Sequence, residues 1–581
     1  MEKEELEELN KKQEMYRHSM SHILAKAVKE LYPNVKLAIG PAIDNGFYYD
    51  FDNVTITPED FGKIEDKMRE IINKNEDFVR VEVSKQEALE LFKDEPYKTE
   101  LINELPEGET ISVYKTGEDF MDLCRGPHVE NTKYLRGFAF KINRASGAYW
   151  RGSEKNKMLT RVYVYGFLDK NDLKAYVQQM EEALKRDHRK LGKELGLFFI
   201  SDYAKGMPTY MPKGLILKNE LIKYWREVHQ KAGYVEIETP MAMNRELWET
   251  SGHWEHYKNN MYTFQCEDDT FAIKPMNCPG GMLYYLQNKH SYKEFPLRVG
   301  ELGKVHRHEA SGTLNGLLRV RCFTQDDAHI FMLPSQIETE VMNVIKLVDE
   351  VYSTFGLTYT VELSTMPESH IGEIEEWQMA ETALANALQN NGLEYKINEG
   401  DGAFYGPKID IHVKDCIGRE WQCGTIQLDM QLPKRFNLTY TDADGSEKEP
   451  IMIHRVIYGS MERMMSILIE NFAGAFPVWL APTQVQIITV SDNNNDYAIS
   501  VQEKLQSKGI RVEVDLSNES VGKKIRNAVI TKSPYVLVLG DKEMADGTVA
   551  VRSRGSKDTV TMNYADFEAE LMDKICNKTL G

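Results

Sequence analysis

The side chains best suited to chemistry in this 581-residue chain alternate along one predicted strand, from Leu318 to His329. Successive side chains of a strand point to opposite faces, so one face is mostly apolar and the other polar. Guanidinium groups pair with phosphate oxygens, a ring can stack on a base, and a carboxylate beside an imidazole suits a metal or an amine. The polar face therefore predicts a nucleotide site with a second ligand beside it; its residues are Arg319, Arg321, Phe323, Gln325, Asp327 and His329.

The alternative is a solvated sheet face with a ladder of charges, because alternation alone indicates only a half-exposed strand. A solvated face normally favours Lys, Glu and Thr, which this face lacks. Turn residues precede the strand at Ser311-Gly312-Thr313 and Asn315-Gly316. Arg307 and Glu309 share one face of the strand that leads into the turn. We therefore expect an antiparallel hairpin with a long loop and a polar functional face.

The stretch Lys304–Phe331 resembles motif 2 of class II aminoacyl-tRNA synthetases, and its run Phe323–His329 resembles that of threonyl-tRNA synthetases in particular. A predicted helix at Leu215–Tyr234, followed by a strand and Pro240, resembles motif 1, the dimer-forming element of class II enzymes. His454–Arg463, a strand into Gly459 and then a helix, resembles motif 3.

The resemblance covers essentially the whole chain and implies an α+β multidomain fold. An α+β editing domain with a linker helix is expected at residues 1–190. The class II catalytic domain, an antiparallel sheet with helices, is expected at 200–482, and an α/β anticodon-binding domain at 483–581. Many family members begin with a further small ubiquitin-like domain, and we expect this form to lack it.

Three residues match the family's zinc ligands one by one: Cys278, His329 and His454. Their wide spacing excludes a finger-like structural site, and three protein ligands leave one coordination position open. Threonine and valine are isosteric, and a hydrophobic pocket separates such pairs by only about 100-fold. A metal that binds both the amino group and the side-chain hydroxyl would reject valine. It would not reject serine, so a second, hydrolytic site is needed.

The resemblance also implies roles around ATP, which Mg²⁺ should accompany. Arg307 neutralises the α-phosphate, and Arg463 and Arg319 hold the outer phosphates. Phe323 stacks on adenine while Glu309 reads its amino group. We expect Arg307, Arg463 and Lys408 to be catalytic; further residues implied around the amino acid and ATP are Gln325, Asp327, Tyr405, Gln422, Gln427 and Ser460.

Two closely spaced pairs of possible ligands lie in the first 130 residues. His18 and His22 share one face of a helix that ends at Pro33, and Cys124-x-x-x-His128 follows much later. These four residues could hold zinc, or they could form a metal-free hydrolytic pocket, which we favour. The region resembles the editing domain of threonyl- and alanyl-type synthetases. The resemblance implies a pocket that removes serine from tRNA, with Lys98 and Asp122 as further members.

An amphipathic helix with Leu173, Tyr176 and Leu184 on one stripe links two domains and ends in the basic run Lys185–Lys190. That run is either a solvated helix end or a tRNA contact. From Val485 onward, strands alternate with helices, which is typical of a sheet with crossover helices. This part resembles the anticodon-binding domain of threonyl, prolyl, histidyl and glycyl enzymes, and the implied anticodon contacts are Asn518, Glu543 and Arg552.

The net charge of −19 argues against broad nonspecific nucleic-acid binding, so RNA contacts must use local positive patches. The seven cysteines are scattered, as in cytoplasmic proteins with reduced thiols. The acidic N-terminus does not resemble a secretion signal, and no apolar run is long enough to span a bilayer. We expect a cytoplasmic homodimer.

Three functions remain open from the sequence. The leading hypothesis is ATP-dependent attachment of threonine to tRNA(Thr), with editing of seryl-tRNA. The alternatives are a catalytically silent paralogue that binds RNA as a regulator, and a prolyl- or seryl-type enzyme. The chain also departs from the family pattern at Gly281, Ala310 and Cys322, where His, Pro and Gly are usual. No expected ligand or phosphate contact is lost there.

Overall fold

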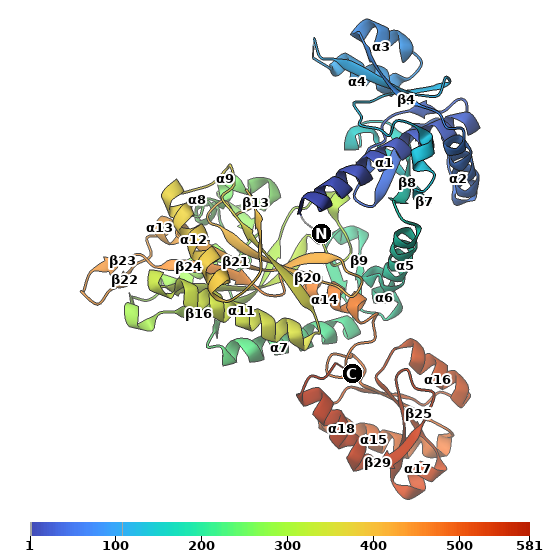
Figure 1. The fold of residues 1–581 in the computed structure, drawn as a ribbon. Helices are drawn as coiled ribbons and strands as arrows, with labels where there is room; N and C mark the ends of the chain where they lie inside the picture. The colour runs from blue at the N-terminus through green and yellow to red at the C-terminus, as the bar shows by residue number, and fades with distance from the viewer. Residues whose placement is uncertain (1–2, 107, 581) are drawn as a thin grey trace. The chain divides into compact units, whose positions relative to one another are not determined.

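The computed structural model describes residues 3–106 and 108–580 (Figure 1). The chain forms two compact units. The units are Met1–Glu181 and Glu182–Gly581, and the division falls inside helix α5 (Lys170–Arg186). Among the described residues, no helix is long and apolar enough to cross a membrane. The division of the chain into three domains at 190–200 and 482 stays a prediction.

The first unit is built around the long helix α1 (Lys3–Leu31), whose buried Ile23, Leu24 and Val28 pack into an apolar core. Strands β3 and β8 form the centre of the sheet order β1-β3-β8-β7, with β2 paired to β3. A second sheet has the order β4-β5-β6. The other elements are β1 (Lys36–Leu37), β2 (Ala42–Ile43), β3 (Gly46–Asp52), α2 (Pro58–Asn73), β4 (Phe78–Val83), α3 (Lys85–Leu91), α4 (Pro96–Glu104), β5 (Ile111–Thr116), β6 (Phe120–Leu123), β7 (Ala139–Tyr149) and β8 (Met158–Phe167).

The second unit contains an eight-stranded sheet of order β11-β16-β17-β24-β21-β20-β18-β19, mostly antiparallel. The expected hairpin is confirmed, since β16 and β17 pair antiparallel across a long loop. In the register, His329 of β17 lies opposite His454 of β24, which lies opposite Gln427 of β21. The strands are β11 (Val235–Glu236), β16 (Leu297–His306), β17 (Cys322–Met332), β18 (Thr358–Ser364), β19 (Lys396–Asn398), β20 (Lys408–Lys414), β21 (Glu420–Asp429) and β24 (Ile451–Val456).

Helices pack against this sheet, and together they form a large apolar core. The expected helix at Leu215–Tyr234 is confirmed as α7 (Pro212–Lys231), which begins three residues earlier because a proline can occupy the first helical turn. Helix α14 (Met461–Asn471), the predicted motif 3 helix, is buried on nearly all sides against α6 (His188–Glu194), α7 and β17. Helices α11 (Ile337–Thr354) and α12 (Ile374–Asn390) contact each other.

Cys278 is the first residue of the short helix α10 (Cys278–Tyr285). This helix follows the hairpin β13–β14 (Tyr262–Cys266 and Asp269–Ile273), to which β12 (Ala242–Asn244) adds a third strand. The thiol is 5% exposed and belongs to an apolar cluster with Met282, Tyr285 and Phe331. The helix therefore brings Cys278 to β17 of the large sheet.

The C-terminal part forms a five-stranded sheet of order β26-β25-β27-β28-β29. The predicted alternation is confirmed by β25 (Val485–Thr489), α15 (Asn495–Ser507), β26 (Val512–Asp515), α16 (Val521–Ile530) and β27 (Tyr535–Leu539). Strand β25 pairs parallel with both β26 and β27. Two antiparallel strands complete the sheet, β28 (Thr548–Ser553) and β29 (Val560–Asn563). The remaining helices of this part are α17 (Asp541–Asp546) and α18 (Tyr564–Cys576).

Candidate functional site

A cavity of about 540 Å³ opens over the middle of the eight-stranded sheet. It gathers thirteen of the residues that the sequence analysis implied for ATP, amino acid and metal. These are Cys278, Arg307, Glu309, Arg319, Phe323, Gln325, Asp327, Tyr405, Gln422, Gln427, His454, Ser460 and Arg463. Residues up to 185 positions apart thus meet at one site, as positions 278 and 463 do.

The side chains of Cys278, His329 and His454 lie together, with their possible ligand atoms within 4.8 Å of one another. All three residues are buried. His329 Nε2 and His454 Nδ1 have no hydrogen-bond partner among the described residues. A buried polar nitrogen without a partner is unfavourable, so two such nitrogens beside a thiol fit a metal ion. Burial lowers the pKa of His329 to about 3, which leaves the imidazole neutral, as a metal ligand must be.

Asp429 fixes the orientation of His454 from the far side of the ring. Its Oδ2 lies 2.8 Å from His454 Nε2, and its Oδ1 accepts the backbone N–H groups of Gln431 and Leu432. With Nε2 held by the carboxylate, Nδ1 is the nitrogen left to face Cys278. A carboxylate behind a metal-binding histidine is the usual device that fixes the tautomer of the ring.

Arg307 and Arg463 line the same cavity, and each is held by backbone carbonyls or a ring. Arg307 donates from Nε to Pro275 O at 3.1 Å, and its guanidinium lies 5.2 Å from the centre of the Phe323 ring. Arg463 donates from Nε to Leu318 O at 3.3 Å and from Nη1 to Gln422 O at 2.5 Å. These contacts fix the arginines but leave guanidinium N–H groups for a polyanion.

Arg319 and Glu309 pair with each other, with Arg319 Nη2 2.9 Å from Glu309 Oε2. Arg321, the second guanidinium expected on the same face, points elsewhere. Its Nε donates to Glu309 O at 2.8 Å and it is absent from the described residues that line the cavity. The reason is that β17 begins only at Cys322, so the alternation does not extend back through Arg321.

Tyr405 and Gln427 line the cavity beside His454, and Tyr405 OH donates to Gln427 Oε1. Gln422 also lines the cavity. Lys408 is not among the described residues that line the cavity. Its Nζ lies 2.8 Å from Asp410 Oδ2 and 3.0 Å from Asp401 Oδ2. Asp410 Oδ1 accepts from Gln422 Nε2 at 2.6 Å, so Lys408 is connected to the cavity through Asp410 and Gln422.

Sequence reasoning missed several residues that shape the site. Asp326 accepts the N–H groups of Ile457 and Tyr458 at 2.9 and 3.0 Å, and burial raises its pKa to about 6. Glu462 accepts from Tyr210, Lys218 and the N–H of Thr324. These two carboxylates join the motif 2 strand to the motif 3 segment. No local pattern predicts them, because their partners are distant in the sequence.

A second cluster lies in the first unit, where α1 meets the segment after β6. His18 Nε2 and His128 Nε2 lie 3.2 and 3.1 Å from Cys124 Sγ. His22 is 2% exposed, and its ring packs edge-on against His18 and at a tilt against His128. The four ligand-type side chains lie close enough together to hold an ion. The sequence-predicted pocket residues are therefore adjacent in space.

Asp122 on β6 holds the rear of this pocket. Its carboxylate pairs with Lys98 of α4, and Tyr49 OH donates to it at 2.6 Å. His22 Nε2 lies 3.8 Å from the same carboxylate. Burial raises the pKa of Cys124 to about 11, so the thiol stays protonated near neutral pH. Burial also lowers the pKa of His22 well below its usual value, which keeps that imidazole neutral.

Comparison with known proteins identifies the family. The class II core domain of tRNA synthetases (G, H, P, S and T) matches residues 262–472, an anticodon-binding domain matches 484–574, and the threonyl and alanyl tRNA synthetase second additional domain matches 111–163. The threonine–tRNA ligase of Clostridium tetani (strain Massachusetts / E88) is 58% identical over 97% of this chain and 88% of its own length. The chain belongs to the threonine–tRNA ligase family.

Further threonine–tRNA ligases agree with this assignment. That of Acetivibrio thermocellus is 58% identical over 97% of this chain and 89% of its own. The RNA binding domain of threonyl-tRNA synthetase from Cryptosporidium parvum Iowa II superimposes with a TM-score of 0.65 at 41% identity, covering 67% of this chain and 98% of that one. Prolyl-tRNA synthetase from Giardia lamblia shares only the fold, with a TM-score of 0.53 at 16% identity over 69% of this chain and 80% of that one.

The three departures from the usual threonine–tRNA ligase pattern lie beside the metal cluster and in the β16–β17 hairpin. At Gly281, a Cβ would lie 3.0 Å from His329 Nδ1, so a larger residue there would press on that ring. Ala310 lies in the loop between β16 and β17, and Cys322 begins β17. Burial raises the pKa of the Cys322 thiol.

The three implied anticodon contacts lie at different places of the C-terminal sheet. Asn518 is exposed between β26 and α16, and the half-buried Arg552 is on β28 opposite Val536. Glu543 lies in α17, where its carboxylate accepts the N–H of Gly540 at 3.0 Å. Arg552 therefore offers a cation on a rigid strand, and Asn518 offers an amide on a loop.

Proposed function

We propose that this threonine–tRNA ligase family member attaches L-threonine to tRNA(Thr) in an ATP-dependent reaction through threonyl-adenylate. The single observation that supports this most strongly is that one cavity is lined by the three arginines and by Cys278 and His454, which form a cluster with His329. An amino-acid site next to a triphosphate site is what adenylate formation needs. The comparisons give no support to a silent RNA-binding regulator. The direct test is ATP–pyrophosphate exchange and tRNA charging with threonine, compared with proline and serine.

In activation, a carboxylate oxygen of threonine attacks the α-phosphorus of ATP. A new oxygen–phosphorus bond forms and the bond to pyrophosphate breaks. Arg307 neutralises charge at the α-phosphate, while Arg463 and Arg319 hold the leaving pyrophosphate with Mg²⁺ bound to ATP. Phe323 stacks on adenine and Glu309 accepts from its amino group. Catalysis on this account is positioning and charge stabilisation, without a covalent enzyme intermediate.

We infer that Cys278, His329 and His454 hold one Zn²⁺ ion. The fit rests on the two imidazole nitrogens without partners and on the carboxylate of Asp429 behind His454. When bound, the ion would recognise threonine by taking both its amino nitrogen and its hydroxyl oxygen as ligands. Asp327 and Gln325 help to fix the amino acid, and Tyr405 and Gln427 border it.

We infer that the N-terminal pocket hydrolyses seryl-tRNA(Thr), with His18, His22, Lys98, Asp122, Cys124 and His128 as its residues. In this pocket, where Cys124 Sγ contacts His18 Nε2 and His128 Nε2, we favour activation of water without a metal. We infer that His22, whose Nδ1 has no partner among the described residues, accepts the proton of the attacking water. Metal analysis of purified protein should give one zinc per chain; two tightly bound zinc ions would contradict the metal-free pocket.

Replacing His22 with alanine should slow hydrolysis of seryl-tRNA(Thr) by about 10²–10⁴-fold, the usual contribution of a general base. The deacylation rate of preformed seryl-tRNA(Thr) measures this. Threonine-dependent ATP–pyrophosphate exchange in the same protein is the control and should be unchanged, because the cavity over the large sheet is in the other unit. Normal deacylation by the His22→Ala protein would exclude this residue as the base.

The remaining proposals concern partners. Asn518, Glu543 and Arg552 contact the anticodon. A homodimer forms through the motif 1 element, where Val235 of the edge strand β11 and Met241 are 45% and 40% exposed. Exposed apolar side chains at a sheet edge favour association. We expect the protein to work in the cytoplasm. Sedimentation velocity at micromolar concentration tests the dimer.

A further inference from the structure

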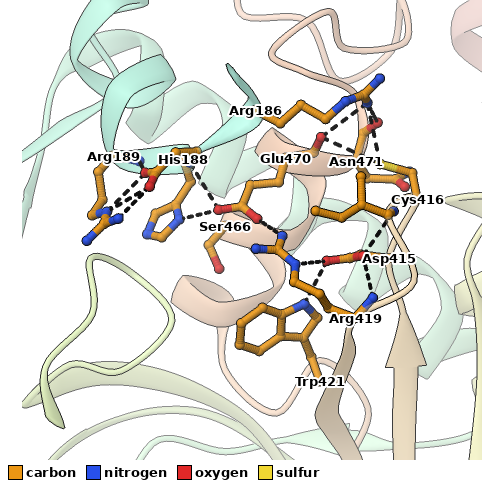
Figure 2. A network of polar contacts seen from close by, with 12 residues as sticks. Arg186, His188, Arg189, Asp415, Cys416, Arg419, Trp421, Ser466, Glu470 and Asn471 are labelled. Carbon is orange, nitrogen blue, oxygen red and sulfur yellow. Dashed lines mark hydrogen bonds and ion pairs between the residues drawn. The ribbon is translucent and has the colours of Figure 1, made fainter. Parts of the chain in front are cut away.

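His188, the first residue of α6, connects three segments that are far apart in the sequence. Figure 2 shows its contact with Glu470. Its ring Nδ1 lies 2.7 Å from Glu470 Oε1 at the end of α14, and its backbone N–H donates to the same oxygen at 3.1 Å. Its Nε2 lies 3.0 Å from the backbone nitrogen of Leu317, in the loop between β16 and β17. The side chain is 1% exposed, so water does not compete for these contacts.

The contacts fix the tautomer of this ring. A backbone N–H can only donate, so Nε2 must accept from Leu317 and must carry no proton. The ring proton is therefore on Nδ1 and is donated to Glu470. Glu470 is held in turn, because Arg419 donates to its other oxygen and Asp415 accepts from Arg419 Nε at 2.7 Å. The imidazole acts as a bridge of fixed polarity between α14 and the loop.

Asp187, His188 and Glu470 also have the spacing of a metal site, but their atoms are already engaged. Both nitrogens of His188 have partners, and the Asp187 carboxylate accepts from the backbone and side chain of Arg189. The carboxylates are thus paired with guanidinium groups. The cluster fits a structural bridge better than an ion.

The loop approaches the imidazole as closely as its backbone allows. Gly316 has φ +50°, and a Cβ on it would lie 2.0 Å from His188 Nε2. Only glycine fits so close an approach. The next residue, Leu317, is fully buried and donates to His188, so this point of the loop is fixed by the ring itself.

The fixed point is adjacent to both arginines that are assigned to the outer phosphates. The carbonyl of Leu318, one residue beyond Leu317, accepts from Arg463 Nε, and Arg319 follows directly. Arg463 is also on α14, seven residues before Glu470, which is about two helical turns. His188 therefore touches the loop of Arg319 and the helix of Arg463 at the same time.

The bridge also belongs to the chain segment that joins the two units. Helix α5 ends at Arg186, two residues before His188. Arg186 Nη1 donates to the carbonyl of Asn471 at 3.0 Å, at the end of α14 (Figure 2). The basic run Lys185–Lys190 is thus not simply a solvated helix end, because Arg186 and His188 anchor the linker on the motif 3 helix.

We propose that His188 is a positioning residue for ATP: its Nε2 holds the Leu317 N–H so that Arg319 and Arg463 are preorganised for the β- and γ-phosphates. The proposal rests on the proposed roles of these arginines in threonine activation. The linker segment would then affect binding of the triphosphate directly, and would not affect binding of the amino acid.

Two substitutions separate the arms of the bridge. The side-chain amide of asparagine replaces Nδ1 and keeps the contact with Glu470, but it does not reach Leu317. Glutamine places a carbonyl oxygen near the position of Nε2 and restores an acceptor for Leu317. ATP–pyrophosphate exchange with the full-length protein gives separate KM values for ATP and threonine. Arg189→Gln is the matched control, since the exposed Arg189 side chain pairs with Asp187 in the same turn.

We expect His188→Asn to raise the KM for ATP about tenfold, the usual effect of leaving one buried N–H unpaired, with the KM for threonine within about twofold. His188→Gln should return the KM for ATP to within about threefold of the wild type, and Arg189→Gln should change neither. If His188→Asn fails to fold, Gly316→Ala perturbs the same contact from the loop and should give the same selective rise.

An unchanged KM for ATP in His188→Asn would overturn the proposal, as would equal rises for ATP and threonine or a His188→Gln protein no better than His188→Asn. These outcomes differ from failure of the proposed function, in which the wild-type protein itself would show no threonine-dependent exchange.

Discussion

Replacing Arg307 with alanine is expected to lower threonine-dependent ATP–pyrophosphate exchange by about 10²–10³-fold or more, the cost of losing one preorganised donor to a developing charge. The effect should be on kcat, because the charge at the α-phosphate grows in the transition state. Arg307 is half-buried over Phe323 and bound to the Pro275 carbonyl, so its position does not depend on substrate.

Arg321→Ala is the matched control for Arg307→Ala. Arg321 is also a half-buried arginine of the motif 2 hairpin, but it binds the Glu309 carbonyl and Ser311 and is not among the described residues that line the cavity. Arg321→Ala should lower the rate of exchange by less than about tenfold, because only the contacts within the loop are lost. Arg307→Lys tests the fork geometry, because lysine keeps the charge without the planar pair of donors. Normal exchange by Arg307→Ala would refute the α-phosphate role.

The second large effect is expected for Cys278→Ser. A serine hydroxyl is a poor substitute for a thiolate, so zinc should be lost and the KM for threonine should rise by at least about 10²-fold. Discrimination between threonine and valine should fall toward the roughly 100-fold limit of a shape-based pocket, because the group that recognises the hydroxyl is gone. The measurements are zinc content and exchange with each amino acid.

Cys423→Ala is the control for Cys278→Ser. Cys423 is a second buried thiol on the same cavity wall, but it lies outside the cluster with His329 and His454. Its replacement should leave zinc content and amino-acid discrimination unchanged. Retention of one zinc ion and of full threonine activation by Cys278→Ser would remove this residue from the ligand set.

Strand alternation correctly predicted which side chains line the cavity wherever the residue lies in a regular strand. Phe323, Gln325 and Asp327 line it because β17 begins at Cys322 and pairs with β16 in register. Arg321 is just outside that strand, where a loop sets the side-chain direction, and the alternation fails. The position of Cys278 came only from family resemblance, since a single cysteine beside a proline carries no local signal.

Contacts between distant segments were beyond prediction from one sequence. The basic run around His188 was compatible with a solvated helix end, and nothing near it indicates that Glu470 and Leu317 are its partners. The roles of Asp326 and Glu462 were equally unpredictable, because the role of a buried carboxylate is recognised only when its hydrogen-bond donors are known.

The central claim is that a zinc ion held by Cys278, His329 and His454 keeps an open position for threonine. X-ray absorption at the zinc edge, on protein with and without threonine or valine, tests it most directly. We predict one sulfur and two imidazole ligands, with additional nitrogen or oxygen ligation on addition of threonine and no change with valine. A protein that activates threonine without zinc, or a zinc spectrum that threonine leaves unchanged, would contradict it.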